Sequence, residues 1–79
     1  MDVRFPSLKS QRLMAILQRE PLCYEVVRQA GSHRWMESQN GYPPLRFSFH
    51  EGVTVPPHTV KKILVRDVGL SEEDALGLI

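Results

Sequence analysis

The order of the predicted elements assigns this chain of 79 residues to the α+β class. Two segments have apolar residues spaced three and four apart, as on one face of a helix. Between them lie three segments rich in β-branched and aromatic residues, which favour strands. A serine followed by acidic residues marks the start of one more helix. Together these observations predict a three-stranded antiparallel sheet with helices on one face, plus a short C-terminal helix.

The composition indicates one globular domain, so residues 1–79 are expected to fold as a single unit. Hydrophobic residues make up 42% of the chain, which is typical of a folded protein, and the net charge of +1 does not by itself indicate nucleic-acid binding. The single Cys23 excludes an internal disulfide and fits a reducing compartment. No apolar run is long enough to span a membrane, and the charged start "MDVRFPSLKSQ" is unlike a secretory leader. We therefore expect a cytoplasmic protein.

The first helix is expected from about Leu8 to Glu20. Ser7 is positioned to cap it, because a serine oxygen can accept a free N–H of the first turn. Pro21 disfavours helical geometry at the preceding residue and so ends the helix. The apolar stripe of this helix consists of Leu13, Ile16 and Leu17.

Three strands are expected next. "CYEVVRQA" forms the first, and Gly31 ends it because glycine permits a bulge or a tight bend. "SHRWMES" forms the second, and "QNGYPP" supplies a turn before the third strand, "LRFSFH". Alternation in this third strand sends two sets of side chains to opposite faces. The apolar set is Leu45, Phe47 and Phe49, and the polar set is Arg46, Ser48 and His50.

The segment "EGVTVPPHT" is expected to be a connecting loop, and the next helix begins at Pro57 or Thr59. Gly69 suits the left-handed position after the end of this helix. Ser71 then caps a last short helix, whose positive first turn carries acidic residues. The apolar stripe of the longer helix is Val60, Ile63, Leu64 and Val68, and the acidic residues are Glu72, Glu73 and Asp74.

The side chains best suited to acid–base chemistry are the three histidines, His33, His50 and His58. Taken alone, each is as well explained by a surface or structural role. Their spacing matches no common zinc-ligand pattern, and Cys23 is solitary. The chain also lacks a phosphate-binding P-loop, a dinucleotide-binding fingerprint and a nucleophile elbow. We therefore expect neither a metal nor a cofactor.

Several segments in order resemble the HicA family of mRNA interferase toxins. They are "LKSQRLMAILQRE", "YEVVRQAGSHRWM", a strand ending in "FH", and "HTVKKILVRDVGLSEED". The resemblance extends from about Leu8 to Asp74. Its most specific parts are the Val-Arg-Gln-Xaa-Gly-Ser-His run at Val27 to His33 and the segment from Thr59 to Glu73. The hairpin "SQNGYPPLRF" and the loop "FHEGVTVPPHT" depart from the family pattern, and the family is usually more basic.

The resemblance implies a fold, an activity and a partner. The fold would be the α-β-β-β-α arrangement of a double-stranded-RNA-binding domain. The activity would be that of the toxin component of a type II toxin–antitoxin system, an endoribonuclease that cleaves mRNA without a metal. His33 would be the catalytic residue, because the family's catalytic histidine lies in Gly-Ser-His, and Gly31 matches the family's glycine. A HicB-like antitoxin would hold the protein inactive, with Arg28, Arg34 and Arg46 meeting its acidic groups.

The chemistry of RNA cleavage is compatible with a single histidine at this place. RNA carries its own nucleophile, the 2′-OH, and an imidazole near neutrality can act as a general base or acid. Strand alternation places His33 and Trp35 on one face, where Arg46, Ser48 and His50 would line the neighbouring strand if that face is open. An exposed Trp35 would stack on an unpaired base. A buried Trp35 would instead supply core area that a small domain needs.

RNA contacts are expected from Gly31, Ser32, Arg46, Lys61 and Lys62. Gly31 allows close approach of a substrate. Lys61 and Lys62 lie early in the second main helix, where ammonium groups and the helix end attract phosphates. A solvated helix face explains the two lysines equally well. A non-catalytic RNA-binding or protein-binding module on the same fold is the alternative to the enzyme.

Overall fold

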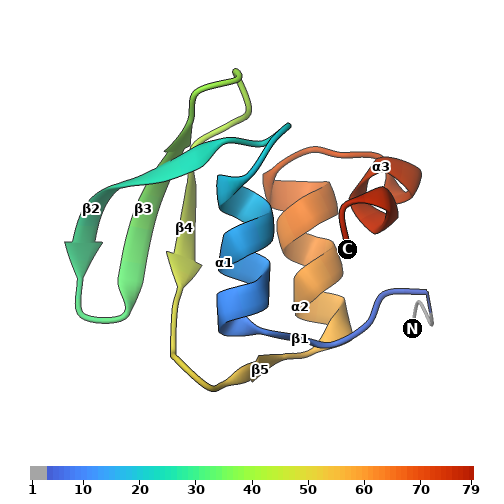
Figure 1. Cartoon of the computed structure of the whole chain (residues 1–79), viewed down its shortest axis with the longest axis horizontal. Helices are drawn as coiled ribbons and strands as arrows, with labels where there is room; N and C mark the ends of the chain where they lie inside the picture. Colours follow the sequence, from blue (N-terminus) through green and yellow to red (C-terminus); the bar gives the residue numbers. More distant parts are fainter. Residues whose placement is uncertain (1–3) are drawn as a thin grey trace.

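The computed structural model describes residues 4–79, so the first three residues of the charged N-terminal segment lie outside it. The chain alternates between short strands and helices, and Figure 1 shows their arrangement. In order, the elements are β1 (Leu8–Lys9), α1 (Ser10–Gln18), β2 (Tyr24–Ala30), β3 (His33–Ser38), β4 (Leu45–Ser48), β5 (Thr54–Val55), α2 (Pro57–Lys61), its π-helical continuation η1 (Lys62–Asp67), and α3 (Glu72–Gly77).

The predicted α+β class and the three-stranded antiparallel sheet are confirmed. The sheet has the order β2-β3-β4, with both pairs antiparallel. In Figure 1 the sheet lies to one side of α1 and α2, and β3 is its middle strand, between β2 and β4. No helix within residues 4–79 has the length and hydropathy needed to cross a bilayer.

One hydrophobic core joins the helices to one face of the sheet. Burial follows the predicted periodicities in the helical stripes and in β4, whereas β2 and β3 each bury a single residue, Tyr24 and Met36. The buried apolar residues are Phe5, Leu13, Ile16, Leu17, Leu22, Tyr24, Met36, Leu45, Phe47, Val55, Val60, Ile63, Leu64, Val68 and Ala75. The other face of the sheet takes no part in this core, which leaves it available for function.

The predicted bounds of the first helix were wrong at both ends. Leu8 and Lys9 are extended because they pair with Val55 and Thr54, so the helix starts at Ser10. Lys9 is the N-cap residue, and Ser7 makes no capping hydrogen bond. The helix ends at Gln18, because Arg19 is already extended with φ −91° and ψ 169°. The segment expected to be only a loop therefore contributes a strand, β5, to this small two-stranded sheet.

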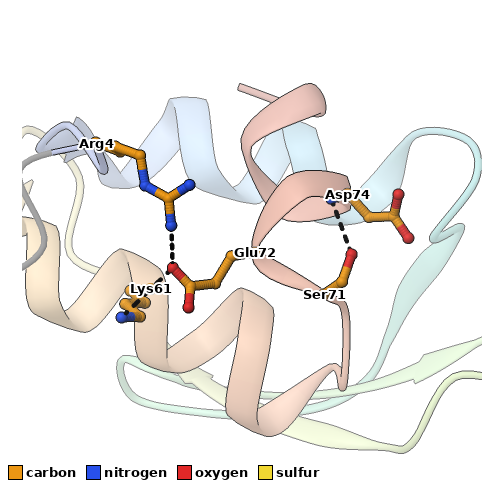
Figure 2. Close-up of polar contacts among 5 residues, drawn as sticks. All are labelled: Arg4, Lys61, Ser71, Glu72 and Asp74. Carbon is orange, nitrogen blue, oxygen red and sulfur yellow. Dashed lines mark hydrogen bonds and ion pairs between the residues drawn. The ribbon is translucent and has the colours of Figure 1, made fainter.

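The C-terminal third agrees closely with the prediction. The helix begins at Pro57, and its apolar stripe is buried. It widens into η1, where the Val68 N–H donates to the Ile63 carbonyl at 2.9 Å. Ser71 caps α3 as expected, since its Oγ accepts from the Asp74 N–H at 3.1 Å (Figure 2).

Candidate functional site

The face of the sheet turned away from the core carries His33, Trp35, Arg46, Ser48 and Arg28, and we call it the open face. Strand register brings these side chains together, because His33 lies opposite Ser48 and Trp35 lies opposite Arg46. On the other side of β3, Arg28 lies opposite Trp35. The predicted alternation of β4 is confirmed, with Arg46 and Ser48 exposed and their neighbours buried. The histidine of the Gly-Ser-His run thus lies on an exposed, polar and aromatic surface.

The turn before His33 is built by Gly31 and Ser32. Ala30 pairs with His33, so these two residues form a two-residue hairpin loop. Gly31 has φ +58°, and a positive φ at the first loop residue alone is the pattern of a type II′ turn, which favours glycine there. A side chain on Gly31 would meet no atom within 4 Å, so the backbone conformation explains the glycine.

Two further hydrogen bonds fix this turn. Arg34 Nη1 donates to the Gly31 carbonyl at 2.7 Å, and the Phe49 N–H donates to the Ser32 carbonyl at 2.8 Å. The Arg34 guanidinium also lies over the Phe49 ring, 5.4 Å from its centroid. Arg34 therefore supports the turn from the opposite side of the sheet. The backbone that carries His33 is held in place while its side chain stays exposed.

Trp35 belongs to the open face and not to the core, which excludes the buried role considered for it. It is half-buried, because neighbouring side chains cover its ring. The guanidinium of Arg28 lies over the indole, 4.6 Å from the ring centroid. On another side the His33 ring meets it edge-on, with centroids 5.9 Å apart. The result is a connected row of Arg28, Trp35 and His33.

A β-bulge at Val27 explains how Arg28 reaches Trp35. Val26 pairs with Met36 and Arg28 pairs with Trp35, so Val27 is an extra residue on β2. Val27 is 49% exposed and shares a surface pocket with Trp35. The only bulge considered from the sequence was at Gly31, so the contribution of Arg28 and Val27 to the open face could not be predicted.

The two lysines predicted to contact RNA lie in different surroundings. Lys61 Nζ lies 3.8 Å from Glu72 of α3, which also pairs with Arg4 (Figure 2). Lys61 thus belongs to a cluster that joins α3 to the N-terminal segment. Lys62 is more exposed and lies 4.0 Å from Asp67, one π-helical turn later. Neighbours in sequence point in different directions on a helix, so only one of the two lies toward the sheet.

A hollow between β4 and η1 connects Lys62 with the sheet. Its volume is about 500 Å³, and Arg46, Lys62, Arg66 and Asp67 contribute to its lining. Three cations face one carboxylate there, so the balance is positive. Arg46 also lines the pocket beside Trp35. A cationic strip therefore leads from the open face across the edge of β4 to η1.

The other two histidines lie outside the strands, although His50 lies close to the hairpin at Ser32, because the Phe49 N–H donates to the Ser32 carbonyl. His50 is exposed and follows the end of β4, and His58 is exposed in the first turn of α2. His58 lines a hollow with Lys61, Lys62 and Arg66 on the helical side. Among residues 4–79, no three histidine, cysteine, aspartate or glutamate side chains gather in a group that could hold a metal ion.

Tyr24 supports the site from beneath the sheet. Its hydroxyl donates to the Pro43 carbonyl at 2.6 Å, which ties β2 to the loop before β4. Burial, together with the smaller effects of the neighbouring Tyr42 and Asp67, raises the pKa of the Tyr24 phenol to about 12. Tyr24 therefore remains a neutral hydrogen-bond donor throughout the physiological pH range.

No protein-family model matches the chain, and neither a curated protein nor a solved structure matches it. The case for a function therefore rests on the residues and on the geometry of the open face.

Proposed function

We propose that this protein is a metal-independent endoribonuclease that cleaves mRNA, with His33 as its general acid or base. In this proposal it is the toxin of a type II toxin–antitoxin system, resembles the HicA family, and has a fold of the double-stranded-RNA-binding-domain type. Its place of action is the cytoplasm, and a HicB-like antitoxin restrains it. The resemblance of the Val27 to His33 run supports the family, and the open face supports the chemistry.

The exposure of His33 on a rigid turn carries the proposal. A catalytic imidazole must reach substrate and yet be held in position. His33 meets both requirements, because its side chain is exposed while Gly31 and Ser32 are anchored by hydrogen bonds from Arg34 and Phe49.

The proposed reaction uses the nucleophile within the RNA. His33 accepts the proton of a 2′-OH as the 2′ oxygen attacks the adjacent phosphorus. A bond forms between the 2′ oxygen and phosphorus, and the bond from phosphorus to the 5′ oxygen breaks. The departing 5′ oxygen takes a proton from water, and His33 releases the proton it accepted to solvent, which leaves a 2′,3′-cyclic phosphate and a 5′-hydroxyl. General acid–base catalysis of this kind contributes roughly 10²- to 10⁴-fold.

The charges around His33 suit an anionic chain. Arg28 and Arg46 flank Trp35 on the open face, and Arg46 continues toward Lys62 and Arg66 at the hollow beside η1. Guanidinium groups bind phosphates well because their donors form a planar fork. Trp35 adds a surface on which an unpaired base can rest. Single-stranded or loop regions of mRNA are therefore the proposed substrate.

The deciding experiment combines RNA cleavage with growth. The purified protein, incubated with mRNA in excess chelator, is expected to give fragments ending in a cyclic phosphate, and its induction without a partner is expected to arrest bacterial growth. The His33→Ala protein is expected to do neither, while remaining folded by circular dichroism. If the folded wild-type protein binds RNA and leaves it intact, the alternative of a non-catalytic binding module is correct.

A further inference from the structure

A small pocket on the open face lies directly beside the Trp35 ring. It has a volume of about 270 Å³, and Val27 and Pro44 contribute apolar walls next to Trp35. This volume lies just below the range of roughly 300–1,000 Å³ that is usual for small-molecule sites. The pocket therefore has room for one flat ring system and not for a peptide segment or a dinucleotide.

Two charged side chains, Glu37 and Arg46, line this apolar pocket. Within the part of the chain that the structure describes, neither makes a hydrogen bond or an ion pair. The contrast with Glu25 is informative, because Glu25 lies opposite Glu37 in the sheet and accepts a hydrogen bond from Gln39 Nε2 at 2.8 Å. The carboxylate of Glu37 and the guanidinium of Arg46 thus remain available to a ligand that offers both donors and acceptors.

Among the RNA bases, guanine matches this pair of groups best. Arginine recognises guanine by donating to O6 and N7. A carboxylate accepts from N–H groups, and guanine places N1–H and the N2 amino group beside O6 on the adjoining edge. Adenine lacks the O6 acceptor, and the pyrimidines lack N7. The apolar walls and Trp35 suit the faces of the ring, because base–aromatic contacts tolerate any base and the edges then supply discrimination.

We propose that this pocket is a guanine-binding subsite for the nucleotide next to the bond that His33 cleaves. The proposal rests on the proposed function, and it adds a specificity determinant to it. Residues two apart on a strand lie about 7 Å from each other on one face, so the pocket beside Trp35 lies one such step from His33. Glu37 and Arg46 recognise the base, and neither takes part in proton transfer.

Trp35 provides the readout, because it is the only tryptophan in the chain. Four 2′-O-methyl RNA tetranucleotides are compared, identical except for a single G, A, C or U. The 2′-O-methyl group blocks the nucleophile, so binding is measured without cleavage. We expect the G-containing oligonucleotide to change Trp35 fluorescence with an affinity about tenfold above the others, as one good edge-recognition pair provides.

Matched glutamine variants test the residue assignment. Glu37→Gln keeps the shape of the side chain, removes its charge, and is expected to lose most of the preference for G. Glu25→Gln is the control, because Glu25 lies in the same row of the sheet and is engaged by Gln39. Thermal melting establishes that both variants are folded. If Glu37→Gln destabilises the protein, Arg46→Gln is expected to lose the preference in the same way.

The possible results separate this subsite from the proposed function. Equal affinity for all four oligonucleotides, or a preference for G that both Glu37→Gln and Arg46→Gln retain, overturns the subsite even if the protein cleaves RNA. A G preference that Glu37→Gln removes supports the subsite even if ordinary RNA stays intact, and the endonuclease proposal then fails alone. The absence of any fluorescence change with all four oligonucleotides overturns the subsite.

Discussion

The imidazole of His33 meets the indole of Trp35 edge-on, with the two ring planes 87° apart. The contact follows from strand geometry, because residues two apart on β3 point to the same face. It limits the orientations that the His33 ring can adopt while leaving the side chain exposed. An aromatic neighbour in this position explains how the exposed His33 ring is restricted in orientation, as the proposed proton transfer requires.

His33→Ala is expected to lower RNA cleavage by roughly 10²- to 10⁴-fold, because one acid–base group is lost. The fold should survive, since an exposed strand position contributes little to stability. Cleavage of a labelled mRNA, measured at equal protein concentration, checks the rate. His58→Ala is the matched control, because His58 is an exposed histidine on α2, and it should cleave at the wild-type rate. A folded His33→Ala protein with full activity would end the case for catalysis by this residue.

Lys62→Ala is expected to weaken RNA binding for all sequences alike. The loss of one phosphate contact should reduce the slope of log affinity against log salt by about one. Lys61→Ala should change this slope less, because Lys61 already pairs with Glu72 on the side of α3. Fluorescence anisotropy at several salt concentrations measures both. Equal slopes for the two variants would mean that the hollow beside η1 does not contact RNA.

Ser71→Ala is expected to destabilise the protein by about 1 kcal/mol, because the Asp74 N–H loses its capping acceptor. Ser7→Ala provides the comparison, since Ser7 is exposed and does not cap α1. Its effect should stay within about 0.5 kcal/mol, as for ordinary surface positions. Urea denaturation of both variants measures the difference. A larger effect for Ser7 would mean that the first helix begins where the sequence pattern placed it.

The raised pKa of Tyr24 predicts that the folded protein loses stability at high pH. Its pKa of about 12 in the folded protein exceeds the ordinary value of 10.0, so the unfolded chain ionises first. The contribution of the neutral phenol to the free energy of unfolding is therefore complete below pH 10.0 and is lost as the pH rises toward about 12. Tyr24→Phe should flatten the stability curve in this range and lower stability near neutral pH by about 1 kcal/mol, through loss of the bond to Pro43.

Absorbance titration of the phenolates provides the direct measurement for Tyr24. The chain contains two tyrosines, so each can be assigned by removing the other. Tyr24→Phe should abolish the step near pH 12, and Tyr42→Phe should retain it. If the high-pH step instead vanishes in Tyr42→Phe, burial of Tyr24 is not the cause.

A HicB-like antitoxin is expected to cover the open face. Arg28 and Arg46 would then meet acidic groups of the antitoxin, which speeds association more than it tightens binding. Hydrogen exchange on the complex should show protection of β3 near His33 and of the hairpin at Gly31. Amides of α3 should exchange as in the free protein. Protection restricted to α3 would exclude direct masking of His33.

Features determined by neighbours in sequence could be predicted. The alternation of Leu45, Arg46 and Phe47 and the cap at Ser71 were confirmed because each depends on residues within one turn or one strand. The predicted start of the first helix was wrong, because Leu8 is extended and pairs with Val55, which is distant in the sequence. No local sequence pattern indicates that pairing, and the pairing overrides the helix propensity of the residues involved.

The candidate site shows the same difference between local features, which could be predicted, and features that depend on distant residues, which could not. The alternation of side chains along the strand predicted that His33 and Trp35 share one face, and the structure agrees with this prediction. The difference between Lys61 and Lys62 depends on Glu72, which belongs to another helix. The position of Arg28 over Trp35 depends on the bulge at Val27. Long-range partners and single-residue irregularities of a strand leave too weak a signal in one sequence.

The same bulge has a consequence for self-association. β2 is an edge strand of seven residues with Val26 and Val27 exposed, and a flat edge of this kind invites the addition of a strand from another molecule. An extra residue at Val27 interrupts the regular spacing of free N–H and C=O groups along this edge. The charged side chains of Glu25 and Arg28 further disfavour the pairing of β2 with a strand of another molecule. The irregularity that positions Arg28 thereby also protects the protein from aggregation through β2.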